Sequence, residues 1–530
     1  MIDPFALPGA TVHYPPDRKF DLEHLRLEVS LDTDGKSVRG SSTITFTALV
    51  GNLRRIDIDA VEMSIKSVKD QARKSLAYDY TGRTLQAYFD RPLAIGEKVT
   101  LRIEYEATPR RGLYFIAPDE AYPNKHLQVW SHGEPEDARY WFPCYDYPND
   151  RMTSEVIATV PDKFVVISNG RLLDVLEDKA NRTRTYHWSQ EVPHVSYLLS
   201  IVAGEFAEIR TEWEGIPITN YVPKEHEKDA LRSFEKTPKM MKFFSDVTGV
   251  KYPYPKYAQL TVEDFLIGGE ENISATTFTQ EILHDERAHL DYSSDPIVAH
   301  ELSHQWFGDL LTCKDWSHIW LNESFATYFD ATFTEYDLGR EEFQARLLEY
   351  YDSYLEEARE KYRRPIVTRT YHDPDELFDR HTYPKGGLVL HTLRYTLGDD
   401  MFWKVIRTYV GKFRDKVVET ADFKTTIEEI TGRSTDLFFE QWLLKPGHPE
   451  LTIKPEWKAE QGILELHVDQ TQDTSDGTPI FQFEAELLVV DEDGENLLKL
   501  NITDKSHVFQ IPLDRKPLSV VLDPDNWMLK

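Results

Sequence analysis

The chain has 530 residues, 40% of them apolar and 12% aromatic, so it is long enough for several domains with ordinary hydrophobic cores. Its 61 basic and 91 acidic residues give a formal charge of -30, which argues against binding to nucleic acid or to a membrane. Two cysteines, an N-terminus unlike a secretion signal and no apolar run of 18 residues predict a cytoplasmic protein, which we expect to be monomeric.

The first third of the chain shows the two-residue period of β-strands. Between about residues 25 and 208, turn dipeptides such as Asp-Gly and Thr-Gly separate short alternating segments such as HLRLEVSL, STITFTAL, KVTLRIEY and EVIATV. Alternation with short turns is typical of antiparallel sheets. We therefore predict an N-terminal antiparallel β domain over residues 1–207.

The helical period dominates from about residue 229. Apolar residues three and four apart occur in DALRSFEKTPKMMKFFSDVTG, DPIVAHELSHQWFGDLL, HIWLNESFATYFDATFTEYDLG, REEFQARLLEYYDSYLEEAREKY, GLVLHTLRYTLG and FFEQWLLKPG. Alternation then returns in LTIKPEW, GILELHVDQ, FEAELLVVD, NLLKLNI and LSVVLDP. We predict a mostly helical domain over residues 208–447 and a small β-sandwich over 448–530, which makes the fold class multi-domain α+β.

A metal-binding pattern lies in one of these helices, for which Asp295 is the expected N-cap and Pro296 the first helical residue. The pattern is the pentapeptide HELSH, in which His300 and His304 are four residues apart. This spacing places both imidazoles on one helix face, about 6 Å apart, where they can bind one Zn²⁺. Glu301 lies one step around the helix and can reach a water beside the metal. The alternative is a pair of surface histidines on an amphipathic helix.

Two acidic residues on the next predicted helix extend the pattern. Glu323, with 18 residues between it and His304, is the expected third metal ligand, because catalytic zinc has three protein ligands. Asp330 lies seven residues further, two turns along the same helix face. It either accepts a hydrogen bond from the far nitrogen of a ligand histidine or is an ordinary solvated carboxylate.

Four segments resemble the M1 family of metallo-aminopeptidases, the gluzincins with a HExxH-x18-E signature. HELSHQWFGDLLTCKDWSHIWLNESFATYFD is similar to the zinc-binding stretch of that family, and GGEEN stands where the family has G-x-M-E-N. HGEPEDARYWFPCYDYP resembles the glutamate segment before F-P-C-x-D-x-P, and TYPKGGLVLHTL resembles the tyrosine motif. The resemblance covers nearly the whole chain. It implies a thermolysin-like catalytic domain, one Zn²⁺ per chain and peptide substrates with a free N-terminus.

The resemblance also assigns roles to single residues. Glu301 is expected to act as general base, and the hydroxyl of Tyr383 to stabilise the oxyanion. Glu271 and Glu134 would bind the α-ammonium group of the substrate, which makes the enzyme an exopeptidase. The positions that match substrate-binding motifs are Glu134, Gly268, Gly269, Glu270, Glu271 and Asn272. Without the family, the two glycines would more often mark a turn.

Two positions depart from the family pattern. Glu270 stands where the family usually has methionine, and His132 where many members have glutamine. Glu270 would add negative charge beside the first substrate residue and favour Lys or Arg, or it would face away from the site into solvent, since neighbouring residues of an extended segment point in opposite directions. The sequence thus predicts a basic or broad preference.

Many relatives carry a further helical domain after the β-sandwich; for this chain we expect three domains without it, and an open cleft that accepts longer peptides. Three other functions stay open: an epoxide hydrolase of the leukotriene A4 hydrolase type, a non-catalytic scaffold of the same fold, and a thermolysin-like endopeptidase. The intact zinc and tyrosine motifs argue against the scaffold, and the pair Glu134 and Glu271 argues against the endopeptidase.

Overall fold

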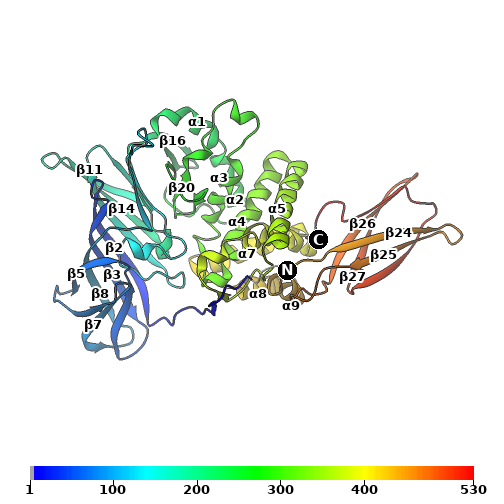
Figure 1. The fold of residues 1–530 in the computed structure, drawn as a ribbon, viewed down its shortest axis with the longest axis horizontal. Helices are drawn as coiled ribbons and strands as arrows, with labels where there is room; N and C mark the ends of the chain where they lie inside the picture. Colours follow the sequence, from blue (N-terminus) through cyan, green and yellow to red (C-terminus); the bar gives the residue numbers. More distant parts are fainter. Residues whose placement is uncertain (1–4) are drawn as a thin grey trace. The chain divides into compact units, whose positions relative to one another are not determined.

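The computed structural model describes residues 5–530, drawn as a ribbon in Figure 1. These residues form two compact units. The first unit contains Tyr14–Trp316 and Val410–Glu419. The second unit contains the N-terminal segment up to His13, Ser317–Tyr409 and Thr420–Lys530.

A seven-stranded sheet dominates the N-terminal part of the first unit. Its strands, in spatial order, are β13 (Arg171–Asp178), β14 (Thr183–His194), β11 (Met152–Pro161), β2 (Phe20–Asp32), β3 (Ser37–Ala48), β8 (Lys98–Ala107) and β5 (Met63–Asp70). All neighbours are antiparallel except β11 and β2, which are parallel. Side chains of β2 and β11 alternate between buried and half-buried, so the period-two pattern predicted this sheet correctly.

Two smaller sheets accompany it. One contains β4 (Leu53–Asp59), β7 (Thr84–Leu93) and β6 (Ala77–Tyr80), and the other contains β12 (Val165–Ser168), β15 (Ile201–Gly204), β10 (Gln128–Ser131) and β9 (Leu113–Ile116). Apolar side chains from all three sheets form one hydrophobic cluster. The N-terminal part of the chain is therefore a β domain, as predicted.

A mixed five-stranded sheet follows, and the helical period did not predict it. Its strands are β16 (Ala207–Trp213), β17 (Ile216–Val222), β18 (Tyr257–Val262), β20 (Ala275–Thr279) and β19 (Gly269–Glu270), with β19 at one edge. Strand β18 is buried along its whole length and carries no alternation, which explains why period counting missed it. The helices α1 (Glu227–Ser233), α2 (Thr237–Thr248) and α3 (Asp295–His304) belong to the same unit, and α3 contacts β19.

The second unit carries most of the helices. They are α4 (Trp320–Leu338), α5 (Arg340–Glu360), α6 (Gly386–Leu397), α8 (Thr420–Thr431) and α9 (Asp436–Leu443), while α7 (Asp399–Phe413) runs across the division between the units. Helix α4 packs against both α5 and α6. The short strands form two pairs: β1 (Thr11–Val12) with β22 (Thr370–Tyr371) in the second unit, and β21 (Leu311–Cys313) with β23 (Lys416–Val418) in the first.

Two antiparallel three-stranded sheets form the C-terminal part of the second unit. One contains β24 (Leu451–Lys458), β25 (Ile463–Gln470) and β28 (Ser506–Pro512), and the other contains β27 (Gly494–Ile502), β26 (Phe483–Asp491) and β29 (Ser519–Leu522). Inward-facing residues of both sheets share one hydrophobic cluster. Strand β28 escaped prediction because six of its seven side chains are exposed or half-buried.

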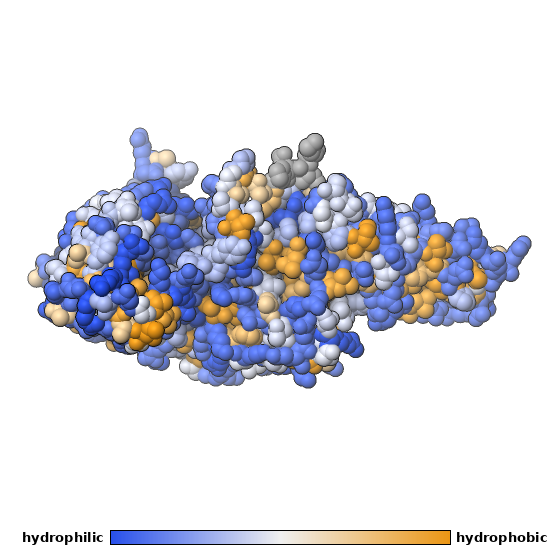
Figure 2. Space-filling model, turned by 90° about the horizontal axis from the view of Figure 1, so that it is seen from below, coloured by the Kyte–Doolittle hydropathy of each residue, from blue (hydrophilic) through white to orange (hydrophobic). Residues whose placement is uncertain are grey.

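The face of the molecule in Figure 2 is mostly hydrophilic, with hydrophobic side chains gathered in small separate patches. Within residues 5–530, no helix has the length and apolar character needed to cross a bilayer.

Candidate metal and peptide site

Helix α3 places the two predicted zinc-ligand histidines of the first unit. It begins at Asp295 with Ser294 as N-cap, so the prediction of Asp295 as N-cap was wrong by one residue. The Asp295 carboxylate lies 2.6 Å from Lys236 Nζ instead of capping the helix. The helix ends at His304, earlier than the apolar pattern predicted, and the following backbone turns so that Phe307 O meets the His304 ring.

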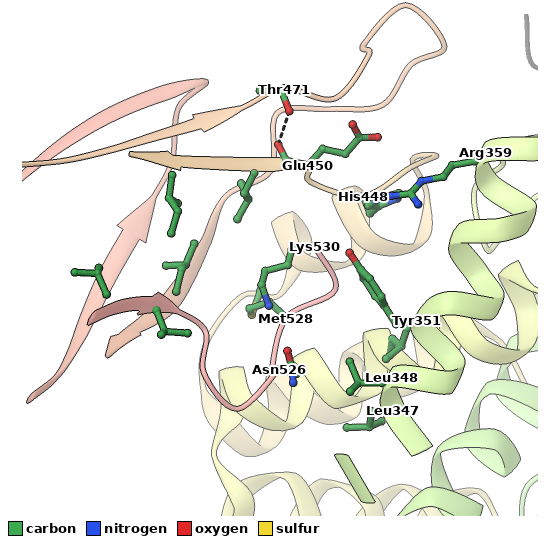
Figure 3. A pocket seen from close by; sticks show the side chains of 16 residues that line it. Leu347, Leu348, Tyr351, Arg359, His448, Glu450, Thr471, Asn526, Met528 and Lys530 are labelled. Atoms are coloured by element: carbon green, nitrogen blue, oxygen red, sulfur yellow. Dashed lines mark hydrogen bonds between the residues drawn. The ribbon is translucent and has the colours of Figure 1, made fainter. Parts of the chain in front are cut away.

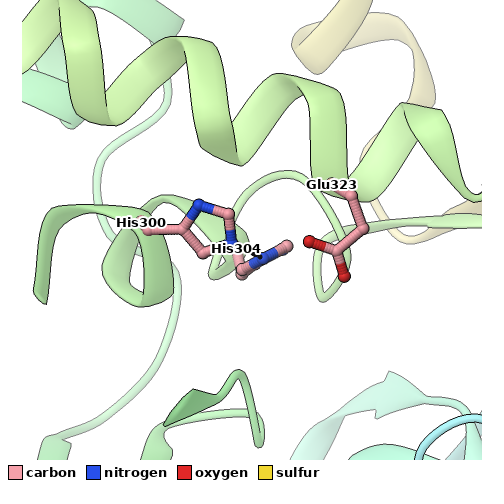
Figure 4. Close-up of side chains that lie close together, drawn as sticks. All are labelled: His300, His304 and Glu323. Carbon is pink, nitrogen blue, oxygen red and sulfur yellow. Dashed lines mark hydrogen bonds between the residues drawn. The ribbon is translucent and has the colours of Figure 1, made fainter. Parts of the chain in front are cut away.

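The two imidazoles of α3 converge. Their Nε2 atoms lie 3.1 Å apart, close to the separation of about 3.3 Å expected for two nitrogens on a tetrahedral zinc ion. His304 Nδ1 donates to Phe307 O at 2.8 Å, which places the ring proton on Nδ1 and the lone pair on Nε2, the atom that faces His300. The donor set in this unit therefore fits zinc. Figure 4 draws His300 and His304 on α3 together with Glu323, which belongs to α4.

Strand β19 runs directly against α3 at the predicted general base. A side chain at Gly269 would place its Cβ 2.5 Å from Glu301 Oε1, and one at Gly268 would place it 2.6 Å from Ile297 Cδ1. Gly269 therefore lets the strand lie close to Glu301, whereas Gly268 faces only the flexible end of Ile297, and neither glycine has a positive φ. This close approach brings the residues after Gly269 next to the histidine helix.

Glu270, the last residue of β19, and Glu271, which follows it, are both buried and have different partners. Glu271 Oε1 accepts a hydrogen bond from Tyr197 OH at 3.1 Å. Glu270 Oε2 lies 3.0 Å from His132 Nε2, and the Glu270 side chain is 0% exposed. The alternative in which Glu270 is solvated is therefore wrong. The two departures from the family pattern contact each other.

Carboxylates gather beside α3. Oxygens of Glu271 and Glu301 and a ring nitrogen of His304 lie within 4.8 Å of one another, and so do oxygens of Glu134 and Glu271. The side-chain amide of Asn272 is buried without a hydrogen-bond partner among the described residues. Buried carboxylates this close together repel each other unless a cation lies between them, so the cluster favours a cationic ligand.

Gly133 shows how Glu134 reaches this cluster. A side chain at Gly133 would place its Cβ 2.3 Å from Tyr197 O, so this glycine lets the Glu134 segment lie directly against Tyr197. The sequence contains no signal for Tyr197, which is one of 27 tyrosines and belongs to no motif. Burial raises its pKa well above the usual value, and Glu271 and Glu134 add to the shift, so the hydroxyl stays a donor.

The second unit holds the remaining predicted residues. Glu323 lies in the first turn of α4 and is buried. Asp330, on the same helix, is 3% exposed, which excludes the solvated alternative. It accepts hydrogen bonds from Tyr350 OH and, at 3.3 Å, from Arg346 Nε. Its predicted contact with a ligand histidine stays a prediction.

Tyr383 lies on a turn of π-helix, His381–Lys385, immediately before α6. Its side chain is half-buried. The turn lies against α4, α5 and α6. Sequence reasoning placed Tyr383 by its motif and did not predict the π-helical turn.

A pocket of about 680 Å³ in the second unit is separate from all of these residues (Figure 3). Side chains of α5 and of the C-terminal strands line it, among them Leu347, Tyr351, Ile453 and Leu522. No predicted site residue lines this pocket.

Two family models match the chain. Residues 13–198 match the peptidase M1 N-terminal domain, and residues 232–442 match the peptidase family M1 domain, so together they cover about three quarters of the chain. Among curated relatives, probable aminopeptidase 1 of Sulfurisphaera tokodaii is 28% identical over 442 residues, which are 81% of this chain and 54% of that protein. Aminopeptidase M1 of Arabidopsis thaliana is 30% identical over 390 residues, 70% of this chain and 42% of that protein.

A solved structure shows the same fold. The crystal structure of Legionella pneumophila aminopeptidase A in complex with aspartic acid matches with a TM-score of 0.83 at 18% identity, over 97% of this chain and 59% of that one. The chain spans about half the length of the curated relatives it matches. The match to both family models extends through the β domain and the helical catalytic domain.

Proposed function

Because the chain belongs to peptidase family M1, we propose that it is a zinc-dependent aminopeptidase that releases the N-terminal residue of peptides. The observation that carries this proposal is the cluster in the first unit, where two convergent imidazoles lie beside three buried carboxylates. The histidines fit a divalent metal, and the carboxylates fit the ammonium group of a peptide.

His300, His304 and Glu323 would hold one Zn²⁺ per chain. When bound, zinc lowers the pKa of a coordinated water towards neutrality and polarises the peptide carbonyl. The convergence of the Nε2 atoms supports the first two ligands. Glu323 is supported by its spacing from His304 and by its burial in the first turn of α4.

Two side chains, Glu301 and Tyr383, would supply the proton transfer and the hydrogen bond that the reaction needs. Glu301 accepts the proton of the attacking water and returns it to the leaving amine. Glu301 is 5% exposed and its carboxylate lies against the backbone of Gly269, so it has little freedom to move. Tyr383 donates a hydrogen bond from its neutral hydroxyl to the oxyanion that develops on the substrate carbonyl.

Glu271 and Glu134 would bind the α-ammonium group. A hydrogen bond to a charged group contributes about 1.5 to 3 kcal/mol, and an internal peptide segment has no cation to offer these acids. Tyr197 orients Glu271 through the hydrogen bond that its hydroxyl donates to Glu271 Oε1. The unpartnered amide of Asn272 adds a polar group that a substrate backbone can satisfy.

The preference for the first residue rests on Glu270. Burial is the main reason that the pKa of His132 falls to about 4, so at neutral pH its imidazole is uncharged and does not neutralise the neighbouring Glu270. This favours Lys or Arg, or a broad specificity, at the first substrate position.

The domain boundaries, the oligomeric state and the cellular compartment are proposed as well. We propose domains over residues 1–207, 208–447 and 448–530, with the two C-terminal sheets forming a small β-sandwich around their shared cluster. We also propose a cytoplasmic monomer. Both cysteines are buried and neither forms a disulfide, which fits a reducing compartment.

The experiment that tests this function combines metal analysis with a substrate panel. Purified chain is expected to contain about one zinc per molecule and to hydrolyse aminoacyl amides and short peptides. A chelator should abolish turnover, and zinc should restore it. N-acetylation of a peptide should block its hydrolysis. Cleavage of acetylated peptides at internal bonds would instead identify an endopeptidase, and a metal-loaded chain without any turnover would favour a scaffold.

A further inference from the structure

The turn that carries Tyr383 is unusual in its backbone. Lys385 N–H donates to Arg380 O at 3.1 Å, a bond five residues long, and Pro384 inside the turn has no N–H to donate. The other four residues of the turn are buried, whereas Tyr383 is half-buried. The turn thus exposes one side chain and anchors its neighbours, and single π-helical turns of this kind recur at functional sites.

An ion pair fixes the beginning of the turn. Asp379 Oδ1 accepts the backbone N–H groups of His381 and Thr382, each at 3.0 Å. The Arg364 side chain is 1% exposed and donates two hydrogen bonds to the same carboxylate, from Nε to Oδ2 at 2.7 Å and from Nη2 to Oδ1 at 2.5 Å. Burial alone would raise the pKa of Asp379, but Arg364 and His381 outweigh it and hold the pKa well below its usual value. The carboxylate is therefore charged and bidentate.

The same network argues against a second metal centre. Ligand atoms of Glu357, Asp379 and His381 lie within 4.8 Å of one another, a spacing that a metal could use. Arg364 already occupies both oxygens of Asp379, and Glu357 Oε2 accepts from Arg380 N–H at 2.8 Å. His381 Nδ1 lies 3.1 Å from the same Glu357 oxygen. These oxygens face N–H donors, so the cluster fixes the backbone.

A second connection joins the turn to α4. Ser324 Oγ donates to Thr382 O at 2.5 Å. A Cβ at Gly386 would lie 1.8 Å from Ser324 Oγ, so only glycine lets the start of α6 approach this hydroxyl. Ser324 directly follows Glu323 in α4. The Tyr383 turn is thus attached to the helical turn that carries the predicted third zinc ligand.

We infer that Ser324, Arg364 and Asp379 are positioning residues that hold the Tyr383 hydroxyl at a fixed place relative to Glu323. The inference rests on the proposed function, in which that hydroxyl stabilises an oxyanion. A hydrogen-bond donor contributes to catalysis only where it meets the developing charge, and a displacement of about 1 Å costs up to roughly a hundredfold in rate. The three residues act through Tyr383.

The first test uses Ser324→Ala and Asp379→Asn in the full-length, zinc-loaded chain. Each is expected to lower kcat about tenfold to a hundredfold, with KM and zinc content near the wild-type values. The matched control is Thr332→Val, which removes a buried hydroxyl of α4 that donates to Phe329 O at 3.0 Å, and it should leave kcat unchanged. If Asp379→Asn does not fold, Ser324→Ala decides the question. Wild-type kcat in the Ser324 variant would overturn the inference.

A double-mutant cycle of Ser324 and Tyr383, measured as kcat, distinguishes a positioning role of Ser324 from a merely structural one. Tyr383→Phe should lower kcat about 10²-fold to 10³-fold, and adding Ser324→Ala to it should cost no more than about twofold. Losses that multiply would show that Ser324 acts independently of the hydroxyl, which overturns the positioning role while leaving the proposed function intact. Full activity of Tyr383→Phe would instead remove the oxyanion role and the inference together.

Discussion

The two units fix the positions of their candidate functional residues in different ways. In the first unit, Glu301 and Glu271 are placed by close backbone packing, because Gly269 lets β19 lie against α3. In the second unit, Tyr383 is placed by a buried ion pair and a serine hydroxyl. The first arrangement should be sensitive to added volume and the second to lost charge or hydrogen bonds. The predictions below test this difference, beginning with the largest effect.

Glu301→Gln should lower kcat by about 10³-fold to 10⁴-fold, because the amide cannot accept the proton of the attacking water. The side chain keeps its volume, so its contact with the backbone of Gly269 should persist. Zinc content, measured on the same sample, should equal that of the wild type. A variant that keeps more than a tenth of the wild-type kcat would show that another group is the base.

Glu271→Gln should lower kcat/KM for aminoacyl amides about tenfold to a hundredfold, since one charged hydrogen bond to the ammonium group is lost. The matched control is Tyr197→Phe, which keeps the carboxylate but removes its hydroxyl partner and should cost less. Comparing free and N-acetylated peptides shows whether selectivity falls as well. Unchanged selectivity in Glu271→Gln would assign ammonium binding to another residue.

Gly269→Ala should lower kcat about tenfold, because the new Cβ would lie 2.5 Å from the Glu301 carboxylate and displace it. Gly268→Ala meets only the flexible end of Ile297 at 2.6 Å, so its loss should be several times smaller. Steady-state kinetics of both variants, with thermal unfolding as the check on folding, compare them directly. Equal losses would mean that the strand is generally intolerant of side chains.

Glu270→Met should shift the preference for the first residue by the smallest amount, lowering the ratio of kcat/KM for Arg over Leu amides about threefold to tenfold. His132→Gln is the matched control, because it leaves the Glu270 charge in place and should keep that ratio. The two ratios are measured with the same substrate pair. An unchanged ratio in Glu270→Met would remove Glu270 from the specificity of the enzyme.

The sequence predicted those strands and helices whose hydrophobic residues recur with a clear local period. Alternation predicted β2 and β11, and the helical period predicted α5, because each of these elements buries one face or one stripe. Helix α4 was also predicted, although its residues Trp320–Phe333 are buried on all sides. The buried strand β18 and the exposed strand β28 lack such a contrast and were missed. The candidate site residues came from the family motifs and stay predictions.

The contacts that place those residues could not be predicted. Tyr197 and Glu271 are 74 positions apart and meet only in the folded chain. The pairing of Glu270 with His132 depends on tertiary structure in the same way, although both were recognised as departures from the family pattern. The end of α3 at His304 was also misjudged, because the helix stops where Phe307 O accepts a hydrogen bond from that ring. Local periodicity carries no information on such long-range partners.

Glu323 is proposed as the third zinc ligand, and zinc affinity in Glu323→Gln tests that proposal most directly. The matched control is Glu335→Gln on the same helix, whose carboxylate pairs with Arg394 at 2.7 Å. The account predicts about one zinc in the wild type and in Glu335→Gln, and an affinity at least about a hundredfold lower in Glu323→Gln. Wild-type zinc affinity in Glu323→Gln would contradict the account.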